Sequence, residues 1–429
     1  MKNEALTSPG GFRDYLPEEA AQRRGMTGKA ERVFVRFGFV PLETPAVEHT
    51  ELIAGEEGFA KQTLTIEGGA LTLRPEHTLP LARVMATNPG IKKPAKLYRI
   101  GPVWRGERQQ AGRFKEFMQA DADIVGSKSV LADVEILALT YTLIKELGVA
   151  NAVIYINHRK LLDGLLKLLK VPKAEQGNVL RVLDKTEKIG WDGVLKELKK
   201  AGVGMKEARV MKSFVTASGK PGSVLQKLQE LLKGNADGEA ALAELTEIVG
   251  YLDTLKVPGR AWRIVPGIIR GLGYYTGLVF EVVAKGHEDV GSVMAGGRYD
   301  KMVGSIGGAD MPAVGVSVGI DRLLAAGVGA ENKLPQGVLV VSDETTVRDG
   351  LMFADELRAA GVSAAPYLGK DKTIKGKLSY AAASGARIVA IIGAEEKKNG
   401  TVTIRDMEAR SQETCPRAEA RARVKKRVL

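Results

Sequence analysis

Residues 98–126 hold the side chains whose types and spacing most clearly indicate chemistry. Arg105, Arg108 and Arg113 surround a predicted loop, and their guanidinium groups are permanently charged forks that suit the oxygens of a polyphosphate. Four polar or aromatic side chains then occupy alternate positions, which share one face of a strand. These four are Phe117, Gln119, Asp121 and Asp123. The segment predicts a phosphate-binding hairpin that lines a polar cavity. The alternative is a hairpin on the surface, whose charged side chains are simply solvated.

Two further places could bring polar groups to the same site. In residues 74–78 a predicted strand becomes a helix, and Glu76 and Thr78 could hold a substrate amine or hydroxyl there. Glu76 could instead be a carboxylate that the helix dipole favours. Arg322 follows another predicted strand-to-helix junction, from which a guanidinium can turn over a bound ring or reach phosphate, or simply face solvent.

Residues 269–277 are rich in glycine, which lets the backbone bend tightly and lets a ligand come close. Arg270, Tyr274 and Tyr275 add a charge and two hydroxyl groups to this segment. The glycine spacing is not that of a dinucleotide-binding loop, and the sequence holds no P-loop lysine-serine motif and no Ser-His-Asp arrangement. These three common kinds of site therefore lose support.

The composition predicts a globular protein with a polyanionic partner. The 429 residues carry a net charge of +12, which favours nucleic acid or nucleotide. Cys415 is the single cysteine and the four histidines show no ligand spacing, so neither a disulfide framework nor a resident metal is expected. A reducing cytoplasm is the expected compartment. No signal peptide and no apolar run of about 20 residues is recognised, so no membrane association is expected.

The pattern of elements predicts an α+β fold, in which an antiparallel sheet is flanked by helices. The expected parts are a first portion of the core at 1–158, a lysine- and leucine-rich helical insertion at 159–259, a second portion of the core at 260–330 and a C-terminal α/β domain at 335–429. The proline-rich segment 39–45 is expected at a sheet edge, because proline cannot donate to a central ladder. In the last domain, residues 399–400 read Asn-Gly and predict a hairpin turn.

Taken together, these segments resemble those of class II aminoacyl-tRNA synthetases and, more narrowly, of the histidyl-tRNA synthetase family, over nearly the whole chain. Residues 38–45, 98–126 and 315–323 are similar to the three motifs of that class. Residues 270–281 and 295–300 are similar to the family's Arg-Gly-Leu-Asp-Tyr-Tyr and Gly-Gly-Arg-Tyr-Asp segments. The resemblance implies a class II catalytic core, a homodimer formed through the first motif, and a C-terminal domain like the family's anticodon-binding domain.

The resemblance also implies a reaction and its residues: histidine is activated by ATP to histidyl-adenylate and is then transferred to the 3′ end of histidine tRNA. The implied histidine-binding residues are Glu76, Thr78 and Gln119 at the α-amino group, Asp123 and Tyr275 at the imidazole nitrogens, and Arg270 and Tyr274. The implied ATP-binding residues are Arg105 at the α-phosphate, Glu107 at the adenine amino group, Arg113 at the outer phosphates, and Phe117 and Arg322 on the two faces of the purine. Arg270 and Arg105 are the implied catalytic residues, Mg²⁺ is expected to accompany ATP, and Gln110 is placed to contact the tRNA acceptor end.

Some positions depart from the family pattern, notably Gly273, where aspartate is usual. One alternative is a catalytically silent paralogue, such as the regulatory subunit of ATP phosphoribosyltransferase. That subunit lacks the C-terminal domain expected here and does not require the arginines that grip ATP. A purely RNA-binding protein would explain the net charge but would leave Glu76, Gln119 and Asp123 without a purpose. The synthetase function is therefore the preferred prediction.

Overall fold

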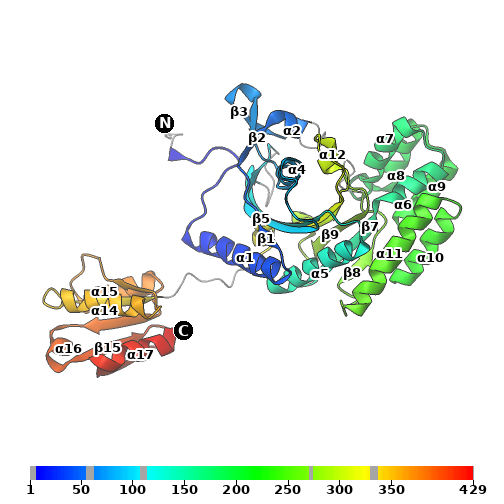
Figure 1. Cartoon of the computed structure of the whole chain (residues 1–429). Helices are drawn as coiled ribbons and strands as arrows, with labels where there is room; N and C mark the ends of the chain where they lie inside the picture. The colour runs from blue at the N-terminus through cyan, green and yellow to red at the C-terminus, as the bar shows by residue number, and fades with distance from the viewer. Residues whose placement is uncertain (1–5, 55–61, 107–113, 270–273, 329–336, 429) are drawn as a thin grey trace. The chain divides into compact units, whose positions relative to one another are not determined.

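The computed structural model describes residues 6–54, 62–106, 114–269, 274–328 and 337–428. The chain divides into two compact units, Met1–Ala330 and Glu331–Leu429 (Figure 1). Within the described ranges, no helix is both long enough and apolar enough to cross a membrane.

A large, mostly antiparallel sheet forms the centre of the first unit (Figure 1). In spatial order its described strands are β1 (Val40–Pro41), β5 (Ala95–Trp104), β6 (Glu116–Val125), β11 (Ala313–Gly319), β10 (Met294–Arg298), β9 (Leu278–Ala284), β7 (Ala152–His158) and β8 (Trp262–Ile264). Of these strands, only β1 and β8 run parallel to their neighbours. The predicted α+β class is confirmed, and the proline-rich segment lies at the sheet edge, as expected.

Strand β6 divides its side chains between two environments. Ala120, Ala122 and Ile124 are buried in the core that two long helices share with one face of the sheet. These helices are α1 (Pro17–Arg36) and α5 (Val130–Glu146). Helix α1 begins with proline, and α5 begins after Ser129, whose hydroxyl accepts a hydrogen bond from the amide of Leu131. Because the helices cover this face, the polar positions of β6 project from the other one.

The other face of the sheet carries a smaller layer around helix α4 (Thr78–Thr87) (Figure 1). This layer includes a three-stranded sheet in the order β2 (Val47–His49), β4 (Leu71–Leu73) and β3 (Leu64–Ile66), and the short helix α12 (Met302–Ser305). Leu81 and Met85 of α4 pack in one buried cluster with Leu97 of β5 and Met302 of α12. This cluster holds the start of α4 over the polar face of β6. The other short helices that the structure describes in this unit are α2 (Thr50–Ala54), η2 (Glu67–Gly69), η3 (Glu288–Val290) and α13 (Ile320–Ala325).

A group of helices occupies the chain between β7 and β8. They are α6 (Arg159–Leu168), α7 (Lys173–Leu183), α8 (Thr186–Lys200), α9 (Met205–Val215), α10 (Pro221–Leu232) and α11 (Ala236–Thr254). Their buried side chains, such as Leu165 and Leu245, belong to the same core cluster as the large sheet. Most of their lysines are exposed, which fits a solvated helical surface. The expected insertion boundaries at 159 and 259 stay a prediction.

The second unit is a five-stranded mixed sheet with helices. Its strands, in spatial order, are β13 (Ala364–Pro366), β12 (Val338–Ser342), β14 (Ile388–Ile392), β15 (Thr401–Asp406) and β16 (Ser411–Pro416). Its helices are α14 (Val347–Ala359), α15 (Ile374–Ala383), α16 (Ala394–Asn399) and α17 (Arg417–Val428). The predicted hairpin turn at Asn399-Gly400 is wrong, because these residues end α16 and Gly400 is its left-handed cap, with φ of 64°. The hairpin instead joins β15 to β16 through residues 407–410.

A buried arginine, Arg298, ties strand β10 to helix α5. Its Nε donates to Oδ1 of Asp133 at 3.0 Å, and its Nη2 donates to the other carboxylate oxygen at 2.5 Å. Its Nη1 donates to the carbonyl of Ser127 at 2.9 Å, and Nη2 also donates to the carbonyl of Ser129. The two side chains are only 8% and 4% exposed. Removal of one partner from such a pair leaves an uncompensated buried charge.

Replacement of Arg298 with methionine should therefore lower the free energy of unfolding of the first unit by about 3–5 kcal/mol. Tryptophan fluorescence during denaturation would measure the change, since all three tryptophans lie in this unit. The matched control is Lys185→Met, which breaks an exposed ion pair with Glu197 and should cost less than about 1 kcal/mol. Equal losses in the two variants would contradict a structural role for the buried pair.

Candidate active site

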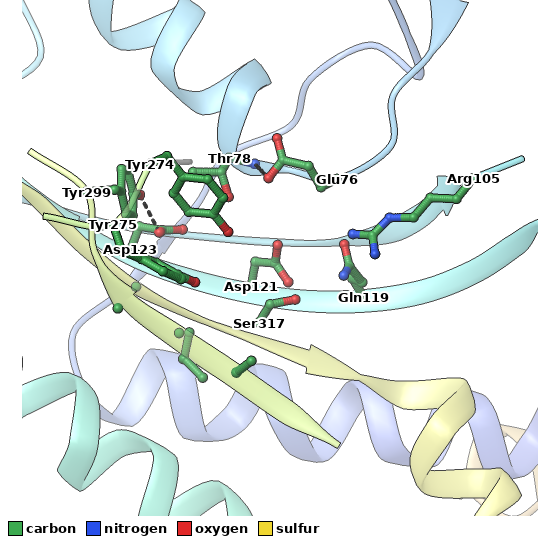
Figure 2. Close-up of a pocket in the computed structure, with 15 residues that line it drawn as sticks. Glu76, Thr78, Arg105, Gln119, Asp121, Asp123, Tyr274, Tyr275, Tyr299 and Ser317 are labelled. Carbon is green, nitrogen blue, oxygen red and sulfur yellow. Dashed lines mark hydrogen bonds between the residues drawn. The ribbon is translucent and has the colours of Figure 1, made fainter. Parts of the chain in front are cut away.

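Two adjoining cavities open on the face of the large sheet that carries helix α4. The first has polar walls, which come from the start of α4, from β6 and from the segments near β10 and β11 (Figure 2). Its polar lining residues are Glu76, Thr78, Arg105, Gln119, Asp121, Asp123, Tyr274, Tyr275, Tyr299 and Ser317. Three carboxylates, an amide and several hydroxyls therefore surround one small space. Such walls suit a small ligand with several hydrogen-bonding groups.

The second cavity continues from the first and has aromatic and cationic walls. Phe114, Phe117 and Arg322 line it, and Nη1 of Arg322 donates to the carbonyl of Ser292 at 2.8 Å. An aromatic ring and a guanidinium can stack on the two faces of a planar base. The residues that line both cavities are Arg105, Gln119, Tyr274, Tyr275, Ala295 and Ser317. Ligands in the two cavities would therefore meet at this shared wall.

Arg105 stands at the shared wall, just beyond the end of β5 (Figure 2). Its Nε donates to the carbonyl of Pro75 at 2.9 Å, and its guanidinium lies 5.2 Å from the centre of the Phe117 ring. These contacts hold the charge in place before any ligand binds. A fixed guanidinium in this position can bind an anionic group such as a phosphate.

Glu76 contacts the start of helix α4 and also faces the first cavity. Its Oε2 accepts from the amide of Thr78 at 2.8 Å and its Oε1 accepts from the amide of Leu79 at 2.5 Å. The carboxylate therefore caps the positive end of the α4 dipole. It also lines the first cavity, where its charge faces the ligand space.

Asp123 is held by two buried partners. It accepts a hydrogen bond from Nη2 of Arg99, on the neighbouring strand β5, and another from the hydroxyl of Tyr299, after β10. Burial raises the pKa of Tyr299 well above its ordinary value, and the Asp123 carboxylate acts in the same direction. The tyrosine therefore stays a donor, and the Asp123 carboxylate is kept in one orientation at the floor of the cavity.

Asp121 lies between Gln119 and Asp123 on the same face of β6. Burial raises the pKa of Asp121 to about 7, and the carboxylates of Asp123 and Glu76 add to this effect, while the guanidinium of Arg99 and a hydrogen bond from Ser317 oppose it. The group is thus divided between its two protonation states near neutral pH.

Three glycines let the backbone of β10 and β11 approach the side chains of the first cavity. A Cβ atom on Gly315 would overlap the carboxylate of Asp123, its partner in the strand register. A Cβ atom on Gly297 would lie 2.8 Å from the ring of Tyr275, and one on Gly296 would overlap the carbonyl oxygen of Gly315. These glycines are required by close packing, since none of them has positive φ.

The structure brings together nine of the residues that the sequence singled out. In the first cavity these are Glu76, Thr78, Arg105, Gln119, Asp123, Tyr274 and Tyr275, and in the second they are Phe117 and Arg322. Five other residues that the sequence singled out lie outside the described part of the chain: Glu107, Arg108, Gln110, Arg113 and Arg270. Their roles remain predictions.

Sequence reasoning assigned no individual role to several residues that shape the first cavity. The alternation on β6 put Asp121 on the correct face but gave it no role. Tyr299 follows the Gly-Gly-Arg segment, a signal that could have identified it. Arg99 lies in the 98–126 segment but was given no role there, and the strand register, which places it opposite Asp121, brings it to the site. The pairing of β11 with β6 likewise brings Ser317 to the cavity, because Ser317 also lies opposite Asp121.

No group of three or more histidine, cysteine, aspartate or glutamate side chains is arranged to hold a metal ion among the residues that the structure describes. A Mg²⁺ ion that enters with a polyphosphate does not need such a group. It keeps several water and phosphate ligands and uses only one or two carboxylates of the protein.

Comparisons with known proteins agree with this geometry. Residues 11–323 match the family model described as histidyl-tRNA synthetase, and residues 337–427 match that of an anticodon binding domain. The chain is 36% identical to the histidine–tRNA ligase of Wolinella succinogenes over 99% of both chains, and 36% identical to that of Aeropyrum pernix over 96% of both. The crystal structure of histidyl-tRNA synthetase from Nostoc sp. PCC 7120 superposes with a TM-score of 0.88 at 30% identity, covering 98% of this chain and 99% of that one. The chain belongs to the histidyl-tRNA synthetase family of class II aminoacyl-tRNA synthetases.

Proposed function

We propose that the chain is a histidine–tRNA ligase, which activates histidine with ATP and transfers it to the 3′ end of histidine tRNA. The observation that carries this proposal is the pair of cavities that share Arg105. A polar cavity suited to histidine opens into an aromatic and cationic cavity suited to ATP. The carboxylate of one substrate would therefore meet the α-phosphate of the other beside a fixed guanidinium.

In this proposal histidine occupies the first cavity. Asp123 and Tyr275 bind the two imidazole nitrogens, because a neutral imidazole offers one donor and one acceptor. Burial and the neighbouring Tyr274 raise the pKa of Tyr275 well above its ordinary value, so its hydroxyl keeps its proton. Glu76, Thr78 and Gln119 surround the α-amino group, and all three line this cavity.

ATP occupies the second cavity and enters as its Mg²⁺ complex. Phe117 and Arg322 stack on the two faces of the adenine, and their positions in this cavity support the assignment. Arg105 binds the α-phosphate. Glu107 at the adenine amino group and Arg113 at the outer phosphates complete the proposed set.

The first step is an in-line displacement at the α-phosphate. A carboxylate oxygen of histidine forms a bond to that phosphorus, the bond to the β-phosphate oxygen breaks, and pyrophosphate leaves. Arg105 and Arg270 stabilise the charge that develops on the α-phosphate oxygens. In the second step a ribose hydroxyl at the tRNA 3′ end attacks the histidyl carbonyl, and AMP leaves with the bonding electron pair.

The proposed partners are histidine tRNA and a second copy of the chain. Gln110 would contact the acceptor end of the tRNA, and the match of residues 337–427 to anticodon-binding domains supports a second contact there. For the homodimer, strand β1 offers a sheet edge on which Val40 is 55% exposed, and a second copy could cover it. A cytoplasmic location is proposed from the free, buried Cys415.

Exchange of labelled pyrophosphate into ATP tests the proposed function directly. The purified chain should catalyse this exchange with Mg²⁺ and histidine, and none of the other nineteen amino acids should support it. Exchange reports adenylate formation without any requirement for the correct tRNA. Binding of histidine without exchange would favour a silent paralogue such as the regulatory subunit of ATP phosphoribosyltransferase.

Replacement of Arg270 with alanine should lower the rate of histidine-dependent exchange by about 100- to 1,000-fold, because a contact to the transition-state charge is lost. Circular dichroism should show an unchanged fold. Arg260→Ala removes an exposed arginine from the same region and serves as the control. Near-normal exchange in the Arg270 variant would refute its catalytic role.

Replacement of Gly315 with alanine should weaken histidine binding by at least about tenfold, because the new Cβ atom must displace the Asp123 carboxylate from its position on the cavity floor. Calorimetric titration with histidine would measure the loss. Gly250→Ala is the matched control, since a Cβ atom there meets open space in a helix and should be neutral or slightly stabilising. Unchanged affinity in the Gly315 variant would exclude Asp123 as a close contact of the ring.

A further inference from the structure

Asp121 is a buried carboxylate of the first cavity to which the proposed roles assign nothing. It is 3% exposed, and it points into the cavity beside Gln119 and Ser317 (Figure 2). Its Oδ1 atom has no hydrogen-bond partner among the residues that the structure describes. The same holds for Oε1 of Gln119. Buried acceptors without a donor are costly, and a ligand that supplies a donor to this pair would remove that cost.

The other two carboxylates of the cavity already have donors on their oxygens. Both oxygens of Glu76 accept backbone amides at the start of α4. Asp123 accepts from Arg99 and from Tyr299. Within the described part of the chain, Asp121 is therefore the carboxylate of this cavity that presents a vacant oxygen.

The charges around the cavity favour a cationic ligand. Three carboxylates face two buried guanidinium groups: that of Arg99, whose Nη2 is bound to Asp123, and that of Arg74, which donates to backbone carbonyls. Arg105 lies at the outer wall, where it faces the second cavity as well. Burial raises the pKa of Asp121, and the neighbouring carboxylates of Asp123 and Glu76 add to this effect. An ammonium group would supply one positive charge and three donors.

We propose that Asp121, together with the side-chain oxygen of Gln119, binds the α-ammonium group of histidine directly, in addition to the contact proposed for Glu76. This inference rests on the proposed function, because its ligand is the amino acid that the chain activates. It makes Asp121 a specificity residue, which selects an imidazole ligand that carries an ammonium group over one that lacks it.

Two histidine analogues separate this role from others. Histidinol keeps both the ammonium group and the ring, and 3-(imidazol-4-yl)propionate keeps the ring without the ammonium. Calorimetry with the full chain should show that Asp121→Asn weakens histidinol binding by about 10- to 100-fold, as expected for a lost charge-assisted hydrogen bond. Binding of the propionate should stay the same or become tighter.

Asp289→Asn is the matched control, because Asp289 is exposed on η3 and lines neither cavity. An equal loss of both analogues in the Asp121 variant would show a structural or ring-binding role and would overturn the inference. Unchanged histidinol binding in that variant would overturn it too. If the wild-type chain binds neither histidine nor histidinol, the proposed function fails together with the inference. If the wild type and the Asp121→Asn variant bind histidinol equally tightly, the inference alone is contradicted.

The pH dependence supplies a second readout. The charged or hydrogen-bonding groups that face Asp121 are Arg99 on β5, Asp123 on β6, Ser317 on β11, and Arg74 and Glu76 before α4. Asp121 is increasingly protonated as the pH falls below its raised pKa, and a protonated carboxyl binds an ammonium poorly. Histidinol affinity should therefore rise between about pH 6 and pH 8 more steeply in the wild type than in Asp121→Asn. The ring of the ligand titrates equally in both experiments, and parallel profiles would count against the inference.

Discussion

The alternation of side chains on strand β6 governs both the core and the active site. Its small apolar residues pack against α1 and α5, and the polar residues between them face the two cavities. A register shift of one residue would exchange the two sets, so that carboxylates would enter the helix-packed core. Pairing with β5 on one side and β11 on the other holds the register along the whole strand.

This arrangement brings three carboxylates, those of Glu76, Asp121 and Asp123, into one cavity, where they repel each other. Neighbouring groups of positive charge compensate for this repulsion. Arg99 is the internal counter-ion, and the α4 dipole stabilises Glu76. The scaffold around the cavity is stabilised in turn by contacts that bind no ligand, of which the Arg298–Asp133 pair is the clearest. The site itself is therefore expected to contribute little to folding, as is common where residues are selected for chemistry.

The sequence predicted the fold class and most of the cavity walls, because these depend on local patterns. Strand alternation singled out Phe117, Gln119 and Asp123, and a strand-to-helix junction singled out Arg322, all of which line the cavities. Arg99 escaped prediction because its partner is chosen by strand pairing, which a local pattern does not reveal. The Asn399-Gly400 dipeptide led to a wrong hairpin prediction because only the local pattern was considered. It is a strong local turn signal, but here Gly400 ends a short helix.

The pairing of β6 with β11 also has a consequence for synthesis of the chain. The paired residues are separated by roughly 190 to 200 positions, so β6 lacks one neighbour until the ribosome has added residue 319. The long helical segment emerges during this interval and can pack earlier from local contacts. A nascent chain stopped after β6 but before β11 would expose the unpaired edge of a strand that carries three acidic residues, Glu116, Asp121 and Asp123. The repulsion between these acidic residues opposes edge-to-edge association of such nascent chains. The partly synthesised chain, in which β6 lacks its neighbour, is thereby protected from aggregation.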